Sequence, residues 1–193
     1  MNYLRIILVA LFMVTQMSAQ QNNLPYYEIP EASQEFTAGA VLSRMIDGLG
    51  FRYYWATEGL STHDLNFKFN EGSRSTRETI THILELSEVI LKTANKQFTK
   101  KYNLSKITDN EKRKITLYNF KAASEIFKQS ESLAPYRMTV KKGDKVVEYS
   151  IWNLMNGPIE DAVWHTGQIA SFRRMSGNPF PKGVSLLTGK VKK

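Results

Sequence analysis

The sequence predicts an all-α protein: an antiparallel four-helix bundle with a small β-hairpin before the last core helix. Three features of the 193-residue chain predict this class. Four segments repeat apolar residues every three or four positions, the spacing that gives a helix one buried face. Two of these segments open on a helix-capping motif. The links between the four segments are short to medium, as in bundles of antiparallel neighbours.

The first helix is predicted to begin after Ser33, which can cap it. Its apolar positions follow steps of four and three, and they are Val41, Met45, Leu49, Tyr53, Ala56 and Leu60. Residues 61–74 are expected to form a connection to the next helix.

The second helix starts at a capping box. In this motif the Ser75 hydroxyl accepts hydrogen bonds from first-turn amides, while Glu78 reaches back to the cap residue. The helix is predicted to run to about Lys96. His82 lies at the border of its broad apolar arc, beside Leu86 and Val89.

The third helix starts at a second capping box, formed by Thr108 and Glu111. It is predicted to end near Pro135. Its expected buried positions are Ile115, Tyr118, Ala122 and Ile126.

The pattern of the chain then changes from a helical period to alternation. Alternating residues on both sides of 142–144 predict a small β-hairpin. A fourth helix is expected between Ser150 and Met175, and the glycine and prolines from Gly177 onward end it. The tail, residues 179–193, is expected to pack through Leu186 and Leu187.

The first nineteen residues have the three parts of a secretory signal peptide. Arg5 gives a positive start, residues 6–14 are apolar, and small residues precede a cleavage point near Ala19. The alternative, a retained N-terminal anchor, is weaker because the apolar run falls short of the ~20 residues that span a bilayer. No second apolar span follows, so the mature chain is expected to be secreted or periplasmic, with no membrane span.

The mature chain is expected to hold one folded unit. Residues 20–32 form a polar lead-in and residues 33–178 form the bundle. The chain has no cysteine, which excludes thiol nucleophiles, thiolate metal ligands and disulfides. Its net charge is +8, and the basic residues cluster at 92–106, 112–114 and 190–193. We interpret these clusters as solvated surface. Nucleic-acid binding needs aromatic residues set among the basic ones on a single face, and an exported protein seldom meets nucleic acid, so we expect no nucleic-acid partner.

A polar stripe interrupts the apolar face of the fourth helix. One face carries, at helical spacing, Leu154, Pro158, Asp161, His165, Gln168 and Phe172. Asp161 and His165 are four residues apart and can bind the same ion. His82 supplies a third ligand from another helix, which leaves coordination positions open, as in catalytic metal sites. Nitrogen and oxygen ligands admit one divalent ion: Zn²⁺, Ni²⁺, Mn²⁺ or Fe²⁺.

Each of these residues also has an explanation without a metal. Residues 156–158, Asn-Gly-Pro, resemble a helix start, which would make Asp161 a first-turn acid favoured by the helix dipole. His165 alone fits a hydrogen-bonded core histidine, and His82 fits a half-exposed position. We assign His63 to the surface, with no role.

Two stretches resemble the DinB superfamily of helical metalloproteins. They are "ITHILELSE" (80–88) and "WNLMNGPIEDAVWHTGQIASFRRMSGNP" (152–179), and the resemblance spans about residues 33–179. It implies a four-helix bundle, often a homodimer, in which three histidines hold a divalent metal. By position, His82 and His165 match two of those histidines. Asp161 stands where the family has the third, so the site either survives as two histidines and one carboxylate or has lost its metal. Gln168 matches a family glutamine that supports the ligands or packs beside them.

These observations leave three functional hypotheses open. The first is an exported, divalent-metal-dependent hydrolase or transferase that acts on an unknown small molecule through a metal-bound water. The second is a non-catalytic envelope binding or scaffold module on the same bundle. The third, a thiol transferase, would require the chain to remain in the cytosol.

Overall fold

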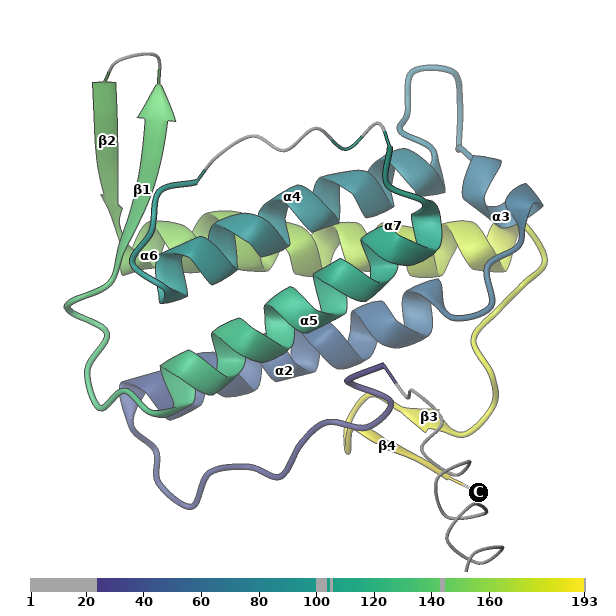
Figure 1. The fold of residues 1–193 in the computed structure, drawn as a ribbon. Coiled ribbons are helices and arrows are strands. Elements are labelled where there is room, and N and C mark those ends of the chain that lie inside the picture. Colours follow the sequence, from purple (N-terminus) through teal and green to yellow (C-terminus); the bar gives the residue numbers. More distant parts are fainter. Residues whose placement is uncertain (1–23, 100–103, 105, 143–144, 193) are drawn as a thin grey trace, which may run out of the picture.

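The structure, a computed structural model, describes residues 24–99, 104, 106–142 and 145–192. The predicted signal peptide lies outside these residues. The described part is mostly helical, with two small antiparallel strand pairs (Figure 1). In chain order its elements are α2 (Ala38–Thr57), α3 (Thr62–Asn66), α4 (Thr76–Ala94), α5 (Asp109–Lys128), β1 (Arg137–Lys142), β2 (Lys145–Ser150), α6 (Ile151–Leu154), the π-helical turn η1 (Met155–Ile159), α7 (Glu160–Met175), β3 (Val184–Ser185) and β4 (Lys190–Val191).

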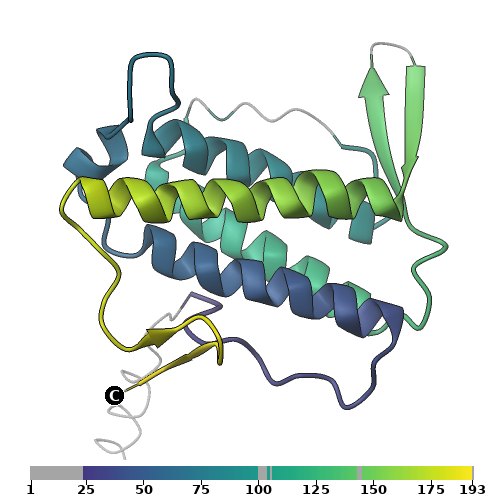
Figure 2. The same cartoon turned by 180° about the vertical axis from the view of Figure 1, so that it is seen from behind.

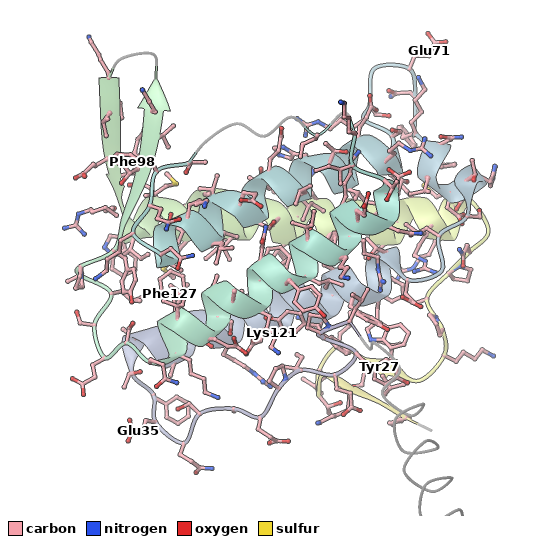
Figure 3. The ribbon with its side chains drawn as sticks, in the orientation of Figure 1. Tyr27, Glu35, Glu71, Phe98, Lys121 and Phe127 are labelled. Atoms are coloured by element: carbon pink, nitrogen blue, oxygen red, sulfur yellow. The ribbon has the colours of Figure 1, made fainter. Side chains whose placement is uncertain are left out.

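The four longest helices lie side by side. α5 packs along both α2 and α4, and α7 packs against the same two helices from the opposite side, as the views in Figures 1 and 2 show. Their facing side chains form the core, which includes Leu42, Ile46, Tyr53, Ile83, Ile90, Leu117, Phe120, Phe127, Leu154, Ala162 and Ile169. Phe127 lies among the packed side chains, whereas Glu35 and Glu71 extend from the surface (Figure 3).

Helix starts follow the predicted capping boxes. Ser75 with Glu78 begins α4, and Thr108 with Glu111 begins α5. The start predicted at Ser33 is wrong, because α2 begins after Thr37, whose hydroxyl accepts from the Ala40 amide.

Two predicted helix ends are also wrong. α2 stops at Thr57, before Gly59 takes a positive φ of 66°, and does not reach Leu60. α5 stops at Lys128 and does not reach Pro135.

The predicted buried face of α2 is confirmed at Leu49, Tyr53 and Ala56, whereas its first turns and the face of α5 are rotated by about one position. Val41 and Met45 are exposed, while their neighbours Leu42 and Ile46 are buried. Tyr118 is exposed in the same way, while Leu117 is buried.

Polar residues buried between α2 and α5 explain this rotation. Ser43 and Ser124 approach to 2.7 Å, Ser124 donates to Asp47, and Tyr26 donates to the same carboxylate. Counting apolar residues alone misses a face that also buries paired polar groups.

The β-hairpin is confirmed. β1 and β2 pair antiparallel from Arg137 opposite Ser150 to Lys142 opposite Lys145, and residues 143–144 lie outside the described residues. The pair projects past the helices (Figure 1).

The N-terminal lead-in and the C-terminal tail pack together. Tyr26 and Ile29 belong to the core, and the Ile29 amide donates to the Gly189 carbonyl at 2.9 Å. The tail does not pack through Leu186 and Leu187, which are exposed. It packs through other residues, Phe180, Val184 and Val191. Within the described residues, no helix combines the length and the apolar character needed to cross a membrane.

A buried arginine joins the ends of α2 and α7. Arg173 is 2 % exposed and donates to the last-turn carbonyls of Trp55 at 2.5 Å and Ala56 at 3.3 Å. It also donates to the Asn178 carbonyl at 2.6 Å. The C-terminal end of a helix carries partial negative charge, so a cation there is favourable.

A second anchor for the end of α7 lies on α3. This short helix falls within residues 61–74, which were predicted to be only a connection. The Asp64 carboxylate is buried and accepts from the Ser61 amide and hydroxyl, from Ser176 and from Asn178. Burial raises the pKa of Asp64, but these hydrogen bonds more than offset that effect and hold its pKa well below the usual range.

We expect Arg173→Met to lower the free energy of unfolding by about 3 kcal/mol, because it leaves buried carbonyls without donors. Urea denaturation measures the change. Arg174→Met is the matched control: Arg174 is exposed, so its loss is expected to change stability by less than about 0.5 kcal/mol. Equal midpoints for the two variants would contradict the role given to Arg173.

Asp64 is expected to make stability depend on acid pH. Its lowered pKa means that its contribution is present above the unfolded-state pKa of about 4 and is lost as pH falls from there through the folded-state value. Urea midpoints of the parent should therefore exceed those of Asp64→Asn at pH 7, and this gap should shrink on acidification. Glu71→Gln, at an exposed carboxylate, serves as the control. A gap that stays constant down to the acid limit would refute the assignment.

Candidate metal centre

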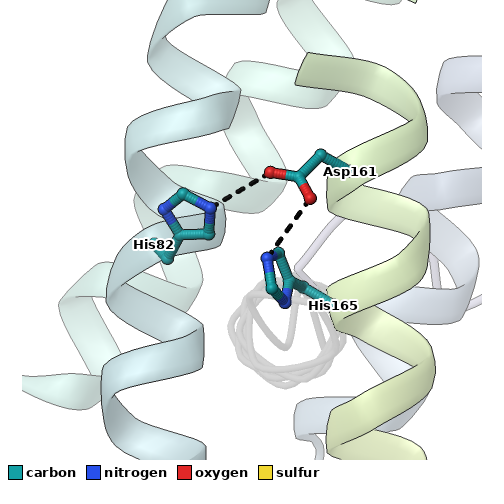
Figure 4. Close-up of side chains that lie close together, drawn as sticks. All are labelled: His82, Asp161 and His165. Carbon is teal, nitrogen blue, oxygen red and sulfur yellow. Dashed lines mark hydrogen bonds and ion pairs between the residues drawn. The ribbon is translucent and has the colours of Figure 1, made fainter. Parts of the chain in front are cut away.

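Three potential metal ligands converge between α4 and α7. His82 comes from α4, and Asp161 and His165 come from successive turns of α7 (Figure 4). His82 Nε2 lies 3.1 Å from Asp161 Oδ2, and His165 Nε2 lies 3.3 Å from Asp161 Oδ1. One ligand atom from each residue can be chosen so that all lie within 4.8 Å of one another. The structure therefore brings together the three residues that the sequence singled out.

The spacing of these atoms suits a shared ion. Ligands about 2.0–2.2 Å from a tetrahedral metal are separated from each other by about 3.3–3.5 Å. The two histidine rings meet edge to face, with centroids 4.7 Å apart, so both can direct a nitrogen toward the carboxylate. The group could hold a divalent ion with positions left for further ligands.

The helical segment before Asp161 sets the direction of this carboxylate. The backbone is helical from Ile151 through Met175, with the π turn η1 containing Pro158 in between. A π turn inserts one residue into the helical repeat and shifts the register of everything after it. The interpretation of residues 156–158 as a helix start is wrong, so a helix dipole at a free N-terminus does not account for Asp161.

His165 is held in a defined orientation by Gln168. The His165 Nδ1 lies 2.7 Å from Gln168 Oε1, and an amide oxygen can only accept, so Nδ1 carries the proton. In the neutral ring, Nε2 is then an unprotonated acceptor. This acceptor faces Asp161 Oδ1, a second electron-rich atom. Two acceptors at this distance repel. The Arg74 guanidinium, 3.4 Å from this nitrogen, offsets part of the repulsion, and a cation or a proton between the two acceptors would remove it.

His82 has a carboxylate near its second nitrogen, at a longer distance and without a hydrogen bond. Its Nδ1 lies 3.7 Å from Glu85 Oε2. Histidine ligands commonly direct their second nitrogen at a carboxylate or carbonyl, which fixes the ring. Sequence analysis missed Glu85. The signal was the spacing His-x-x-Glu, which parallels His165-x-x-Gln168.

The site lies at the edge of the helix packing, and the expectation of a fully buried stripe is wrong. The side chains of His82, Asp161 and His165 are 24 %, 41 % and 13 % exposed. The buried face of α7 is one position further round, at Ala162, Thr166 and Ile169. A small molecule in solvent can therefore reach the three ligands.

Arg74 also contacts the site, and sequence analysis did not predict it. Its Nη1 lies 3.4 Å from His165 Nε2 and approaches from the loop before α4. Nothing in the spacing of the chain signals a contact across 91 positions. His63 is exposed on α3, outside this group.

Fold and site together define a mostly helical protein with a candidate three-ligand metal centre. Comparison with known proteins adds no relative: no protein-family model, curated protein or solved structure matches the chain. The function of the site therefore has to be inferred from its own residues and distances.

We expect the His165 ring of metal-free protein to carry its proton on Nδ1 at pH 8. Long-range ¹H–¹⁵N correlation spectra distinguish the two ring nitrogens. Gln168→Leu removes the acceptor and should shift the proton toward Nε2. The exposed His63 ring is the internal reference and should not change. A proton found on Nε2 of the parent protein would contradict the proposed orientation.

Proposed function

We propose that the chain is an exported member of the DinB superfamily, built on an antiparallel four-helix bundle, and that it is a divalent-metal-dependent hydrolase or transferase. Support comes from the positions of the ligands: one histidine on the second long helix, and an acid–histidine pair four residues apart on the last. The lateral packing of the four helices agrees with such a bundle.

One observation carries the metal proposal. The acceptor nitrogen of His165, fixed by Gln168, faces an Asp161 oxygen at 3.3 Å, and His82 faces the other oxygen of the same carboxylate at 3.1 Å. A divalent cation among these atoms would replace the repulsion between His165 and Asp161 and the hydrogen bond between His82 and Asp161 with coordination.

The protein side of the chemistry follows from the arrangement of these residues. When bound, a divalent ion supplies a Lewis acid and lowers the pKa of a coordinated water. His82, Asp161 and His165 hold it with nitrogen and oxygen donors, which suits Zn²⁺, Ni²⁺, Mn²⁺ or Fe²⁺. Gln168 orients the imidazole of His165 through a hydrogen bond, and Glu85 lies 3.7 Å from the second nitrogen of His82. The partial exposure of Asp161 gives a small molecule access.

Export is the part of the proposal that rests on the sequence alone. Residues 1–19 carry the charge, apolar run and small residues of a signal peptide, with cleavage near Ala19. Low-molecular-weight thiols are scarce outside the cytosol, so export disfavours a thiol transferase.

The second candidate function is a non-catalytic binding or scaffold module without a metal. The distances that suit coordination also suit hydrogen bonds from two protonated rings to one carboxylate. In this case Asp161 would tie α4 to α7 as a structural group.

Metal titration separates the two candidates. Protein purified without a nickel column should bind one equivalent of Zn²⁺ or Mn²⁺, and His82→Ala should weaken binding about 100-fold or more because it removes one of three ligands. Bound metal should also raise the melting temperature of the parent protein, and a chelator should reverse this.

His63→Ala is the matched control, because it removes an exposed histidine outside the group. It should bind metal as the parent does. Less than a tenth of an equivalent bound by the parent, or equal affinity in both histidine variants, would reject the metalloenzyme proposal in favour of the scaffold module.

A further inference from the structure

A cationic side chain stands directly beside the proposed metal ligands. Arg74 Nη1 lies 3.4 Å from His165 Nε2, within hydrogen-bond range of the lone pair that the metal proposal assigns to coordination, so the guanidinium gives up this contact when an ion binds. A protein that only had to bind a cation would gain nothing from a second positive charge here, because like charges repel at this range.

The loop that carries Arg74 is anchored at both ends. Ser75, the next residue, is the N-cap of α4 and is fixed by its capping box with Glu78. The Thr76 amide donates to the Phe67 carbonyl at 2.9 Å. The Phe67 ring packs on Phe172 of α7, with centroids 5.7 Å apart. The stem of Arg74 is therefore held next to the same helix that supplies two of the ligands.

Arg74 differs from other arginines of this region in its partners. Arg77 pairs with Asp109 at 2.8 Å, and Arg113 pairs with Glu58 at 2.5 Å. In the part of the chain that the structure describes, no carboxylate oxygen lies within the 4.0 Å ion-pair limit of Arg74. Its guanidinium remains able to bind an anion from solution.

We infer that the site binds its substrate through an oxyanion group, a carboxylate or phosphoryl, held between the bound metal ion and the Arg74 guanidinium. This inference rests on the proposed function, since the ion provides one side of the anion site. The planar guanidinium offers paired donors that match two oxygens of a carboxylate or phosphate. An anion in this place also neutralises the repulsion between the guanidinium and the ion.

The test titrates inorganic phosphate and acetate into protein loaded with Co²⁺, whose visible spectrum reports a change of ligands. Both the Co²⁺ loading step and the anion step are followed. We expect anion binding to require Co²⁺. Arg74→Gln should weaken it by about tenfold or more, the effect of losing a charge-assisted hydrogen bond. Co²⁺ affinity itself should stay equal or rise, because a repelling charge is gone.

Two further variants control for charge and geometry. Arg174→Gln removes the same charge from an exposed position nine residues along α7, about 14 Å from His165. It should leave anion binding within about twofold of the parent, given screening over that distance. Arg74→Lys keeps the charge without the planar pair of donors and should fall between the parent and Arg74→Gln.

The outcomes distinguish the inference from the proposal beneath it. If Co²⁺ binds but Arg74→Gln and Arg174→Gln bind anions equally well, the anion site is refuted and the metal centre stands. The same conclusion follows if metal-free protein binds the anions as tightly as Co²⁺-loaded protein does. If Co²⁺ does not bind to the parent, both are refuted. Tighter binding of phosphate than of acetate assigns the oxyanion to a phosphoryl group, and the reverse order assigns it to a carboxylate.

Discussion

The buried Arg173 guanidinium fixes the position of the last helix, and the candidate site depends on that position. It donates to two carbonyls at the end of α2 and to the Asn178 carbonyl. These hydrogen bonds keep the C-terminal end of α7 from sliding along its axis. Asp64 holds the same end through Ser176. Asp161 and His165 belong to the same helix, so the contacts of Arg173 and Asp64 help to set the position of these two residues along α4. Residues 173–178, which follow the polar stripe, therefore stabilise the position of α7.

The site combines rigid ligands with open access. The hydrogen bond to Gln168 orients the His165 ring, and the His82 ring has the Glu85 carboxylate 3.7 Å from its second nitrogen. Pre-set ligands lose little conformational freedom on binding. Asp161 is the least buried of the three, which leaves one side of the group toward solvent. This combination of order and exposure is typical of sites that exchange ligands.

Sequence patterns predicted the features that depend on residues close together in the chain. They missed the features that depend on residues far apart in the chain. Capping boxes located the starts of α4 and α5, and four-residue spacing paired Asp161 with His165. The phase of the first turns of α2 was wrong because polar groups such as Asp47 are buried in pairs whose partners lie far along the chain. Arg74 was missed for the same reason: it belongs to a loop without periodicity, and only folding brings it to His165.

α7 uses separate faces for folding and for chemistry. Ala162, Thr166 and Ile169 face the core, while the ligands occupy the adjacent, half-exposed positions. A ligand can therefore be exchanged without opening a cavity among the packed side chains. In evolutionary terms, residues on this surface can change at little risk to the stability of the fold, so the chemistry of the three-residue group can vary while the bundle stays the same.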